Sequence, residues 1–295
     1  ALGDTLRTWV NGVPVAHLVD DKTPEGFIAL QVHSIPDDQE PGKEIVWRNI
    51  RILTDSLQQY TKPMPLEPVQ TRNRLTYAEA ESGWRLLWDG VSTAGWRGAK
   101  RDGFPELGWR ITDGSLIVEA SGGEESGAGG DIVTEAQYGD FELSEDFKIT
   151  HGANSGIKYY VDTGLNKGEG SAIGLEYQIL DDQNHPDARL GNHEGSRTVA
   201  SLYDLIAADP DKPIHPTGEW NTAVIRSDQG HVEHWLNGVK DLEYERGSEA
   251  YRKLVSESKY KVWPDFGEAE QGHILLQDHG DEVHFRNIKI KPLNE

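Results

Sequence analysis

Short runs of apolar or alternating residues, bounded by Gly, Asn and Asp, recur along the C-terminal two thirds of the chain. Between about residues 83 and 293 these runs are GWRLLWDG, GWRITDGSLIVEA, DFELSEDFKI, SGIKYYV, GLEYQIL, WNTAVIRS, HVEHWLNGV, HILLQD and VHFRNIKI. Alternation with a period of two, interrupted by turn residues at this spacing, is typical of antiparallel strands in two packed sheets. Only TYAEAES and YRKLVSESK (251–259) fit a helical pattern. The pattern therefore predicts an all-β sandwich with one sheet face left to solvent or to a ligand.

Three of these runs offer polar side chains on one face. Glu176 and Gln178 share a face in GLEYQIL, and Lys158 and Tyr160 share a face in SGIKYYV. In HVEHWLNG, His234 lies on the opposite face of the strand from Glu233 and Trp235. A concave sheet that carries such residues is the usual binding cleft of a sandwich, so we expect these side chains to meet in a cleft.

An internal repeat is the second feature of the chain. Three segments near the N-terminus are similar to three later segments in the same order: LRTWVNG, PEGFIALQVHS and IVWRNIRIL match VEHWLNG, QGHILLQDHG and VHFRNIKIK. The Pro-rich, polar stretch between the two sets suits an extended connector. The sequence thus predicts the C-terminal fragment of a first sandwich domain over 1–57, a linker over 58–82 and a complete sandwich domain over 83–295. Exposed strand edges in such a fragment favour self-association.

Charge and composition narrow the classes of partner. The 50 acidic and 29 basic residues give a net charge of −21, which repels phosphate backbones and anionic lipids and argues against nucleic acid as a partner. No apolar run approaches 18 residues, so membrane insertion is not expected. The chain begins without Met and without a signal-peptide pattern, which we interpret as processing or truncation. The absence of Cys excludes a thiol nucleophile and Cys-ligated metals.

Eight motifs of the complete region, in order, resemble those of the bacterial 3-keto-disaccharide hydrolase family. They are GWRLLWDGVSTAGWRG, GGDIVTEAQYGDFELS, ANSGIKYYV, GLEYQILDDQNHPDA, RTVASLYDLI, GEWNTAVI, VEHWLNGV and LQDHGDEVHFRNIKI. The resemblance implies a concanavalin A-like (lectin/glucanase) jelly-roll sandwich, a periplasmic or extracellular location, and action on sugars oxidised to a ketone at carbon 3. The first copy has Thr8 in place of His234 and Val32 in place of Asp278. We therefore expect the second copy to hold the chemistry.

A 3-keto-glycoside offers a particular route to cleavage. The ketone acidifies the hydrogen on carbon 2, the resulting enolate can expel the group on carbon 1, and water can then add back to give net hydrolysis. With the family resemblance, this chemistry points to Glu176 and His234 as the proton-transfer residues. Substrate contacts are expected from Asn154, Lys158, Gln178, Tyr203, Asp204, Gln277, Asp278 and His279.

Three alternatives stay open on sequence alone. Gln277, Asp278 and His279 could hold a divalent cation together with Glu176, although no compact cluster with ligand spacing supports a metal cofactor. The same sandwich also serves non-catalytic, lectin-like carbohydrate-binding modules, which would bind an oligosaccharide or glycoside without cleaving it. A simple glucanase would need two facing carboxylates, and Glu176 has no such partner on its own strand.

The stretch SGGEESGAGG (121–130) lacks the ending of a phosphate loop and is interpreted as a loop beside the cleft.

Overall fold

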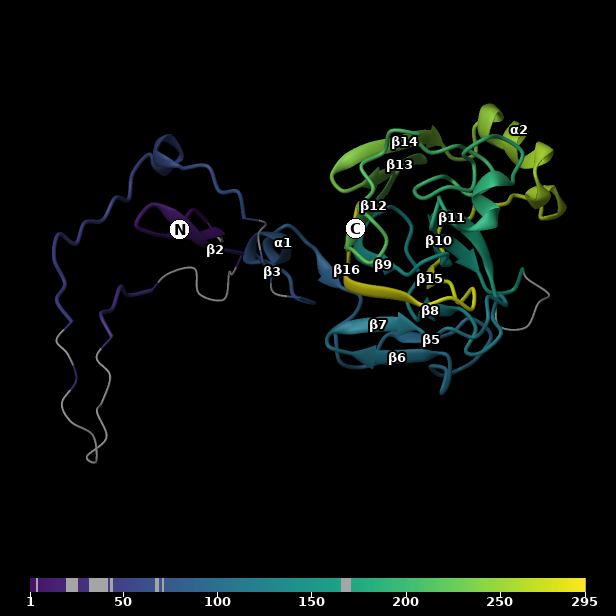
Figure 1. Cartoon of the computed structure of the whole chain (residues 1–295). Helices are drawn as coiled ribbons and strands as arrows, with labels where there is room; N and C mark the ends of the chain where they lie inside the picture. The colour runs from purple at the N-terminus through teal and green to yellow at the C-terminus, as the bar shows by residue number, and fades with distance from the viewer. Residues whose placement is uncertain are drawn as a thin grey trace. The chain divides into compact units, whose positions relative to one another are not determined.

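The computed structural model describes residues 1–3, 5–19, 26–31, 42, 45–66, 69–70, 72–165 and 171–294 (Figure 1). The chain divides into two compact units, the first of residues 1–71 and 76–78 and the second of residues 72–75 and 79–295. Among the described residues, no helix is both long enough and apolar enough to span a membrane.

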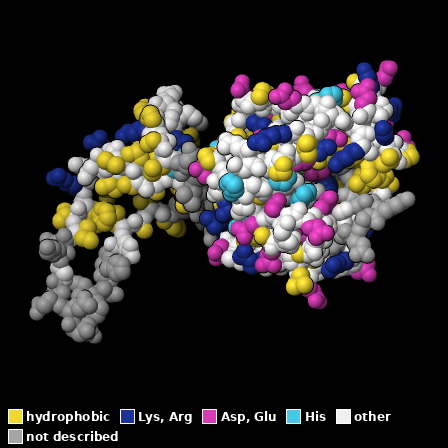
Figure 2. Space-filling view, turned by 45° about the vertical axis from the view of Figure 1, so that its right-hand side comes forward, with side chains coloured by type: hydrophobic (Ala, Val, Ile, Leu, Met, Phe, Trp, Pro, Cys, Tyr) yellow, Lys and Arg dark blue, Asp and Glu magenta, His cyan; other side chains and the backbone are white. Residues whose placement is uncertain are grey.

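The first unit is built on a hairpin of β1 (Thr5–Val10) and β2 (Val13–Val19), which turns at Asn11 and Gly12 with positive φ at both residues. The short strand β3 (Val69–Gln70) runs parallel to β2, and η1 (Leu57–Tyr60) is a single 3-10 turn. Large apolar side chains are exposed along the unit, as Figure 2 shows. They include Val10, Val13, Phe27, Ile28, Val46, Trp47, Ile50 and Ile52.

The repeat is visible in the backbone of the two units. Asn11 and Asn237 both have a positive φ, 51° and 49°, and Asn49 and Asn287 both have a φ of 55°. However, residues 45–53 do not form a strand in the first unit, whereas the matching segment VHFRNIKIK pairs with strands on both sides in the second. Val32 lies outside the described residues. The origin of the first unit as a domain fragment and its self-association stay predictions.

The second unit is a sandwich of two antiparallel sheets, as the strand pattern predicted. The five-stranded sheet has the order β11-β10-β15-β8-β5, and the larger sheet has the order β14-β13-β12-β9-β16-β7-β6 with β4 beside β16. The strands are β4 (Arg85–Leu86), β5 (Trp96–Gly98), β6 (Trp109–Thr112), β7 (Ser115–Val118), β8 (Ile132–Thr134), β9 (Phe141–Ile149), β10 (Asn154–Asp162), β11 (Ile173–Leu180), β12 (Asn221–Asp228), β13 (His231–Leu236), β14 (Val239–Glu245), β15 (His273–Leu276) and β16 (Val283–Pro292).

The two predicted helices are present, as α1 (Tyr77–Glu81) and α2 (Glu249–Glu257). Two 3-10 turns, η2 (Pro186–Arg189) and η3 (Lys259–Val262), complete the described helical elements of the second unit. Ser258 joins α2 to η3: its side chain accepts a hydrogen bond from the N–H of Tyr260, and its own N–H donates to the carbonyl of Val255. This junction matters because η3 forms a wall of the cavity described below.

The core lies between the two sheets and draws on alternate residues of their strands. Leu175, Tyr177 and Ile179 of β11 are fully buried in it, so Glu176 and Gln178 face away from it, as the alternation predicted. Burial of each large apolar side chain of this kind contributes about 1.5–3 kcal/mol, which makes this core the main source of the unit's stability.

One predicted alternation fails on β10. Tyr160 was expected to share a face with Lys158, but it has a φ of 50° and lies where the pairing register with β11 shifts. This bulge turns the ring of Tyr160 toward the core, where its hydroxyl donates to the carbonyl of Gly139 at 2.7 Å and lies 2.8 Å from Ser227 Oγ. A bulge moves every later residue to the other face, and the residue pattern alone did not reveal it.

Candidate active site

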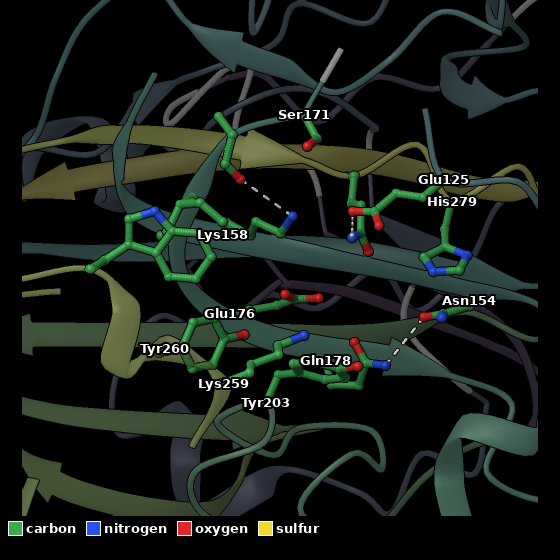
Figure 3. A pocket seen from close by; sticks show the side chains of 15 residues that line it. Glu125, Asn154, Lys158, Ser171, Glu176, Gln178, Tyr203, Lys259, Tyr260 and His279 are labelled. Atoms are coloured by element: carbon green, nitrogen blue, oxygen red, sulfur yellow. Dashed lines mark hydrogen bonds between the residues drawn. The ribbon is translucent and has the colours of Figure 1, made fainter. Parts of the chain in front are cut away.

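A cavity of about 350 Å³ opens on the face of the five-stranded sheet that points away from the core (Figure 3). Strands β10 and β11 form its floor, the glycine-rich loop 121–130 and the end of β15 form one wall, and η3 forms another. Its lining residues are Glu125, Asn154, Lys158, Ser171, Ala172, Ile173, Gly174, Glu176, Gln178, Tyr203, Lys259, Tyr260, Trp263, Gln277 and His279.

Glu176 and Lys158 form the charged floor of this cavity. They are direct partners in the register of β11 and β10, and both are buried. Burial raises the pKa of Glu176, while Lys158 and Lys259 act in the opposite direction. A carboxyl group with a raised pKa holds its proton up to a higher pH than an ordinary glutamate, which suits it to take and return a proton.

Two acceptor groups position the ammonium group of Lys158. Its Nζ lies 3.6 Å from Asp131 Oδ2 and 3.5 Å from the carbonyl oxygen of Ala172. Burial acts to lower the pKa of Lys158, but Asp131, Glu176 and Glu125 outweigh it and the pKa is raised. Burial raises the pKa of Asp131 to about 7, with Lys158 opposing. Asp131 is therefore the ion-pair partner of Lys158 behind the cavity floor.

Gly156 on β10 provides the space that the Glu176 side chain occupies. A methyl group on Gly156 would lie 2.4 Å from Glu176 Oε1 and 3.0 Å from its Cδ, which is closer than atoms can pack. The carboxylate position therefore depends on a glycine in the neighbouring strand.

We expect Gly156→Ala to displace the Glu176 carboxylate and to lower kcat/KM by up to about 100-fold, because a misplacement near 1 Å can cost that much. Steady-state kinetics on a 3-keto-glucoside, the substrate class that the motif resemblance implies, and the thermal unfolding temperature measure the two effects separately. Gly103→Ala is the matched control, since a methyl group there meets no described atom within 4 Å and φ is not positive. Unchanged kinetics in a folded Gly156→Ala protein would contradict the role assigned to the carboxylate position.

Three buried amide side chains line the cavity beside Glu176. The carboxamides of Gln178 and Asn154 lie 3.2 Å apart. Turned by 180°, the Gln178 amide fits its neighbours better, because its nitrogen then donates to the carbonyl of Ser155 at 3.0 Å and to Glu176 Oε1 at 3.2 Å. Gln277 donates to Glu125 at 3.3 Å, and its Oε1 is buried without a hydrogen-bond partner among the described residues. Such amides suit sugar hydroxyl groups, which both donate and accept.

Tyr203 also lies in the cavity, as expected, and its hydroxyl donates to Asp187 Oδ2 at 2.8 Å. Its ring faces two cations, with Lys259 Nζ 4.3 Å and Arg197 Cζ 5.1 Å from the ring centroid. His279 lines the cavity as well, and its Nδ1 is buried without a partner among the described residues.

Asp204 and Asp278 were expected to contact substrate, but the structure places both behind the cavity wall. Asp204 is buried and accepts from Arg197 Nε at 2.9 Å. Asp278 is fully buried, and its carboxylate accepts from the N–H groups of Gly129, Gly130 and Gly280. A carboxylate saturated by backbone donors anchors the glycine-rich loop and has no free oxygen for a sugar.

His234 also lies away from the cavity, contrary to the expectation that it joins Glu176. Strand β13 belongs to the larger sheet, and the side chain of His234 lies on the inner face of that sheet. It therefore points into the core, where it is fully buried. Its Nδ1 is 2.8 Å from the carbonyl oxygen of Ala200, and its Nε2 is 2.7 Å from the hydroxyl of Tyr159. A carbonyl can only accept, so Nδ1 carries the proton and Nε2 accepts from Tyr159. Burial lowers the pKa of His234 to about 4.

Eight lining residues escaped the sequence analysis. Besides Ser171, Ala172, Ile173 and Gly174, at and just before the start of β11, they are Glu125, Lys259, Tyr260 and Trp263. Glu125 comes from the glycine-rich loop, which was placed beside the cleft without a role for its carboxylates. Lys259, Tyr260 and Trp263 belong to η3 and the residue after it. No pattern in YRKLVSESK indicates that the end of this helical segment folds over the face of a sheet almost 80 residues earlier in the chain.

Within the described part of the chain, Glu176 and His279 do not belong to a group of possible metal ligands. Among the described residues, the group of three whose ligand atoms lie within 4.8 Å of one another is His231, Glu233 and Glu243, on β13 and β14 rather than in the cavity. Lys240 already pairs with both of those carboxylates. The divalent cation therefore stays an untested hypothesis without geometric support.

The fold and the cavity together define a β-sandwich protein with a polar, sugar-sized site on one sheet. The model of the 3-keto-alpha-glucoside-1,2-lyase-like domain matches residues 1–53 and 83–291, and this chain belongs to that family. The resemblance of the eight motifs is thereby confirmed.

Two known proteins place the chain more closely. A 3-keto-disaccharide hydrolase of Bacteroides thetaiotaomicron is 38% identical over 232 residues, which are 72% of this chain and 79% of the relative. A crystal structure from Parabacteroides distasonis, assigned as a glycosyl hydrolase, is 31% identical with a TM-score of 0.66, over 76% of this chain and 100% of that chain. The second unit is a concanavalin A-like jelly-roll sandwich, as predicted, and the comparisons support glycoside hydrolase function.

Proposed function

We propose that this chain cleaves 3-keto-glycosides or 3-keto-disaccharides by elimination followed by hydration, which together give net hydrolysis. The observation that carries the proposal is Glu176, a buried carboxyl group with a raised pKa on the floor of a polar cavity, beside two lysines. The family match and the activity named for the Bacteroides relative support it.

The cavity residues fit the successive needs of this reaction. Glu176 takes the proton from carbon 2, and the electron pair of that C–H bond becomes the C2–C3 double bond of an enolate, whose oxygen carries the negative charge. The electrons then return to break the C1–O bond, and Glu176 gives its proton to the departing oxygen. Water adds to the resulting unsaturated ketone, with its oxygen on carbon 1 and a proton on carbon 2. Cations near the enolate oxygen lower the barrier of the first step.

The amide and imidazole groups along the cavity hold the sugar. Asn154, Gln178 and Gln277 can donate to and accept from hydroxyl groups, and His279 presents a buried ring nitrogen without a described partner. Several such contacts orient carbon 2 toward the carboxylate, which is worth more to the rate than binding alone.

Ordinary two-carboxylate hydrolysis is the second candidate, because Glu125 also faces the cavity. Glu125 is exposed on the loop 121–130 and accepts from Gln277, while Glu176 is buried beside Lys158. A retaining or inverting glycosidase would act on unoxidised glycosides with this pair. The keto route needs only one of the two carboxylates and uses the adjacent lysines.

Release of the aglycone from a 3-keto-glucoside and from the matching unoxidised glucoside tests the proposal. We expect turnover of the keto substrate alone, with the same rate after treatment with a chelator, since the described residues of the cavity form no metal ligand set. Equal turnover of both substrates would indicate the glycosidase route. Binding of both without turnover would indicate a carbohydrate-binding module, and loss of activity in chelator would establish the cation.

We also propose that the protein acts outside the cytoplasm. The family resemblance favours a periplasmic or extracellular location, where saccharides released outside the cell would be met. Fractionation of a producing bacterium, with detection of the protein in each compartment, tests this proposal.

A further inference from the structure

The two lysines of the cavity stand in different surroundings. Lys158 is a strand residue with an ion-pair partner, Asp131, behind the floor. Lys259 comes from η3 on the opposite wall, and none of the described residues forms an ion pair with it or accepts a hydrogen bond from its Nζ. A substrate can therefore meet the ammonium group of Lys259 without first breaking an ion pair within the described chain.

Aromatic rings and a capped turn fix the position of Lys259. Its Nζ lies 4.3 Å from the centroid of Tyr203 and 5.3 Å from that of Tyr260. The ring of Tyr260 stacks on Phe266 with centroids 4.1 Å apart, and the N–H of Tyr260 donates to Ser258 Oγ at 3.0 Å. Figure 3 shows the amine pointing into the cavity on the side of Glu176. Aromatic faces attract the cation without saturating its three donors.

The electrostatics agree with this geometry. Burial lowers the pKa of Lys259, and Arg197 and Lys158 act in the same direction, while Glu176 and Asp204 oppose them. Lys259 in turn helps to lower the raised pKa of Glu176. A cation that is partly desolvated and unpaired is stabilised when negative charge develops beside it, which is the condition for preferential stabilisation of a transition state.

We propose that Lys259 is a catalytic residue whose ammonium group donates a hydrogen bond to the ketone oxygen of the substrate as the enolate forms, while Lys158 stays paired with Asp131. The inference rests on the proposed function and assigns the enolate-stabilising role to a residue outside the sheet. In the first step the proton of carbon 2 moves to Glu176, the C3–O π electrons move onto the oxygen, and Lys259 keeps its own proton while it stabilises the new charge.

Three variants of the full chain test the proposal on a 3-keto-glucoside with a chromogenic aglycone. Lys259→Met removes the charge and is expected to lower kcat by about 10²- to 10³-fold with an unchanged unfolding temperature. Lys259→Arg keeps a cation that does not titrate, so it should recover most of the rate at neutral pH and lose the fall in kcat/KM at alkaline pH that deprotonation of Lys259 causes in the wild type. Lys261→Met, in the same turn but outside the cavity lining, is the matched control.

Each other outcome overturns a different statement. Equal rates for Lys259→Met and Lys261→Met, with a wild type that turns over, would overturn the role of Lys259 and leave the proposed function standing. An inactive Lys259→Arg, together with a borohydride-trapped substrate adduct on Lys259 by mass spectrometry, would overturn the hydrogen-bond role in favour of covalent catalysis. A wild type without turnover of the keto substrate would overturn both proposals.

Discussion

The Glu176→Gln variant is expected to lose about 10²- to 10⁴-fold in kcat toward a 3-keto-glucoside, which is the usual contribution of a positioned general base. Glutamine has the shape of the carboxylate and its side-chain oxygen can still accept from the Gln178 amide, so the unfolding temperature should change little. Because the variant still presents a hydrogen-bonding group to the sugar, KM should move far less than kcat. Stopped-flow or steady-state kinetics, together with thermal unfolding, measure these effects.

The pH profile adds a second readout for Glu176. Its raised pKa means that the carboxylate form, which acts as the base, is lost at a higher pH than for an ordinary glutamate. The wild-type kcat/KM should therefore rise with pH through this pKa, and the residual activity of Glu176→Gln should lack that limb. Glu125→Gln is the matched carboxylate control, and we expect it to reduce the rate much less. An equal loss in Glu125→Gln would favour two-carboxylate hydrolysis.

The second large expected effect is a pH dependence of the free energy of unfolding that is caused by His234. The folded pKa is about 4, below the ordinary value of 6.5, so between these two pH values the unfolded chain binds a proton that the folded chain does not. Stability must therefore fall as the pH is lowered from 6.5 to 4, and it levels off below 4. Since one pKa unit corresponds to about 1.4 kcal/mol, the total loss from this group is about 3 kcal/mol.

A His234→Gln variant isolates this contribution. Glutamine can donate to the carbonyl of Ala200 and accept from Tyr159 without titrating, so the variant should be less stable than the wild type at pH 7.5 and should approach or exceed it near pH 4. Urea unfolding across this range, followed by Trp fluorescence, measures the difference. His231→Gln is the control on the same strand: its histidine is partly exposed and its pKa is raised by Glu245, so its pH effect should have the opposite sign. Parallel curves for the wild type and His234→Gln would rule out a buried neutral histidine.

This histidine also explains how a core residue can influence the site. His234 holds the carbonyl of Ala200, a residue with a φ of 69°, and the same loop carries Tyr203, whose N–H donates to the carbonyl of Glu176 at 3.0 Å. Loss of His234 can therefore disturb the cavity through the loop. A small effect of His234→Gln on kcat, against a large one of Glu176→Gln, separates positioning from proton transfer.

The local pattern of residues predicted the elements of the second unit and the floor of its site. Alternation in GLEYQIL fixed that Glu176 and Gln178 share a face, because successive side chains in a regular strand point to opposite sides. Alternation failed at Tyr160, where a bulge changes the face. At His234 the alternation was right, but the prediction assigned its face to a cleft, whereas that face packs in the core. Alternation predicts which residues share a face of a strand, but it does not predict whether that face meets the core, solvent or a ligand.

The sequence by itself therefore determined the all-β sandwich and the family, because each depends on local periodicity or on motifs in a fixed order, and it singled out Glu176 as the candidate carboxylate. Only the tertiary structure decided which sheet each strand joins, and so placed His234 in the core and Asp278 behind the glycine-rich loop. It also brought Glu125 and Lys259 to the cavity from segments far apart along the chain. Such contacts between distant segments are set by the packing of the whole sandwich, which leaves no periodic signal in any single stretch of residues.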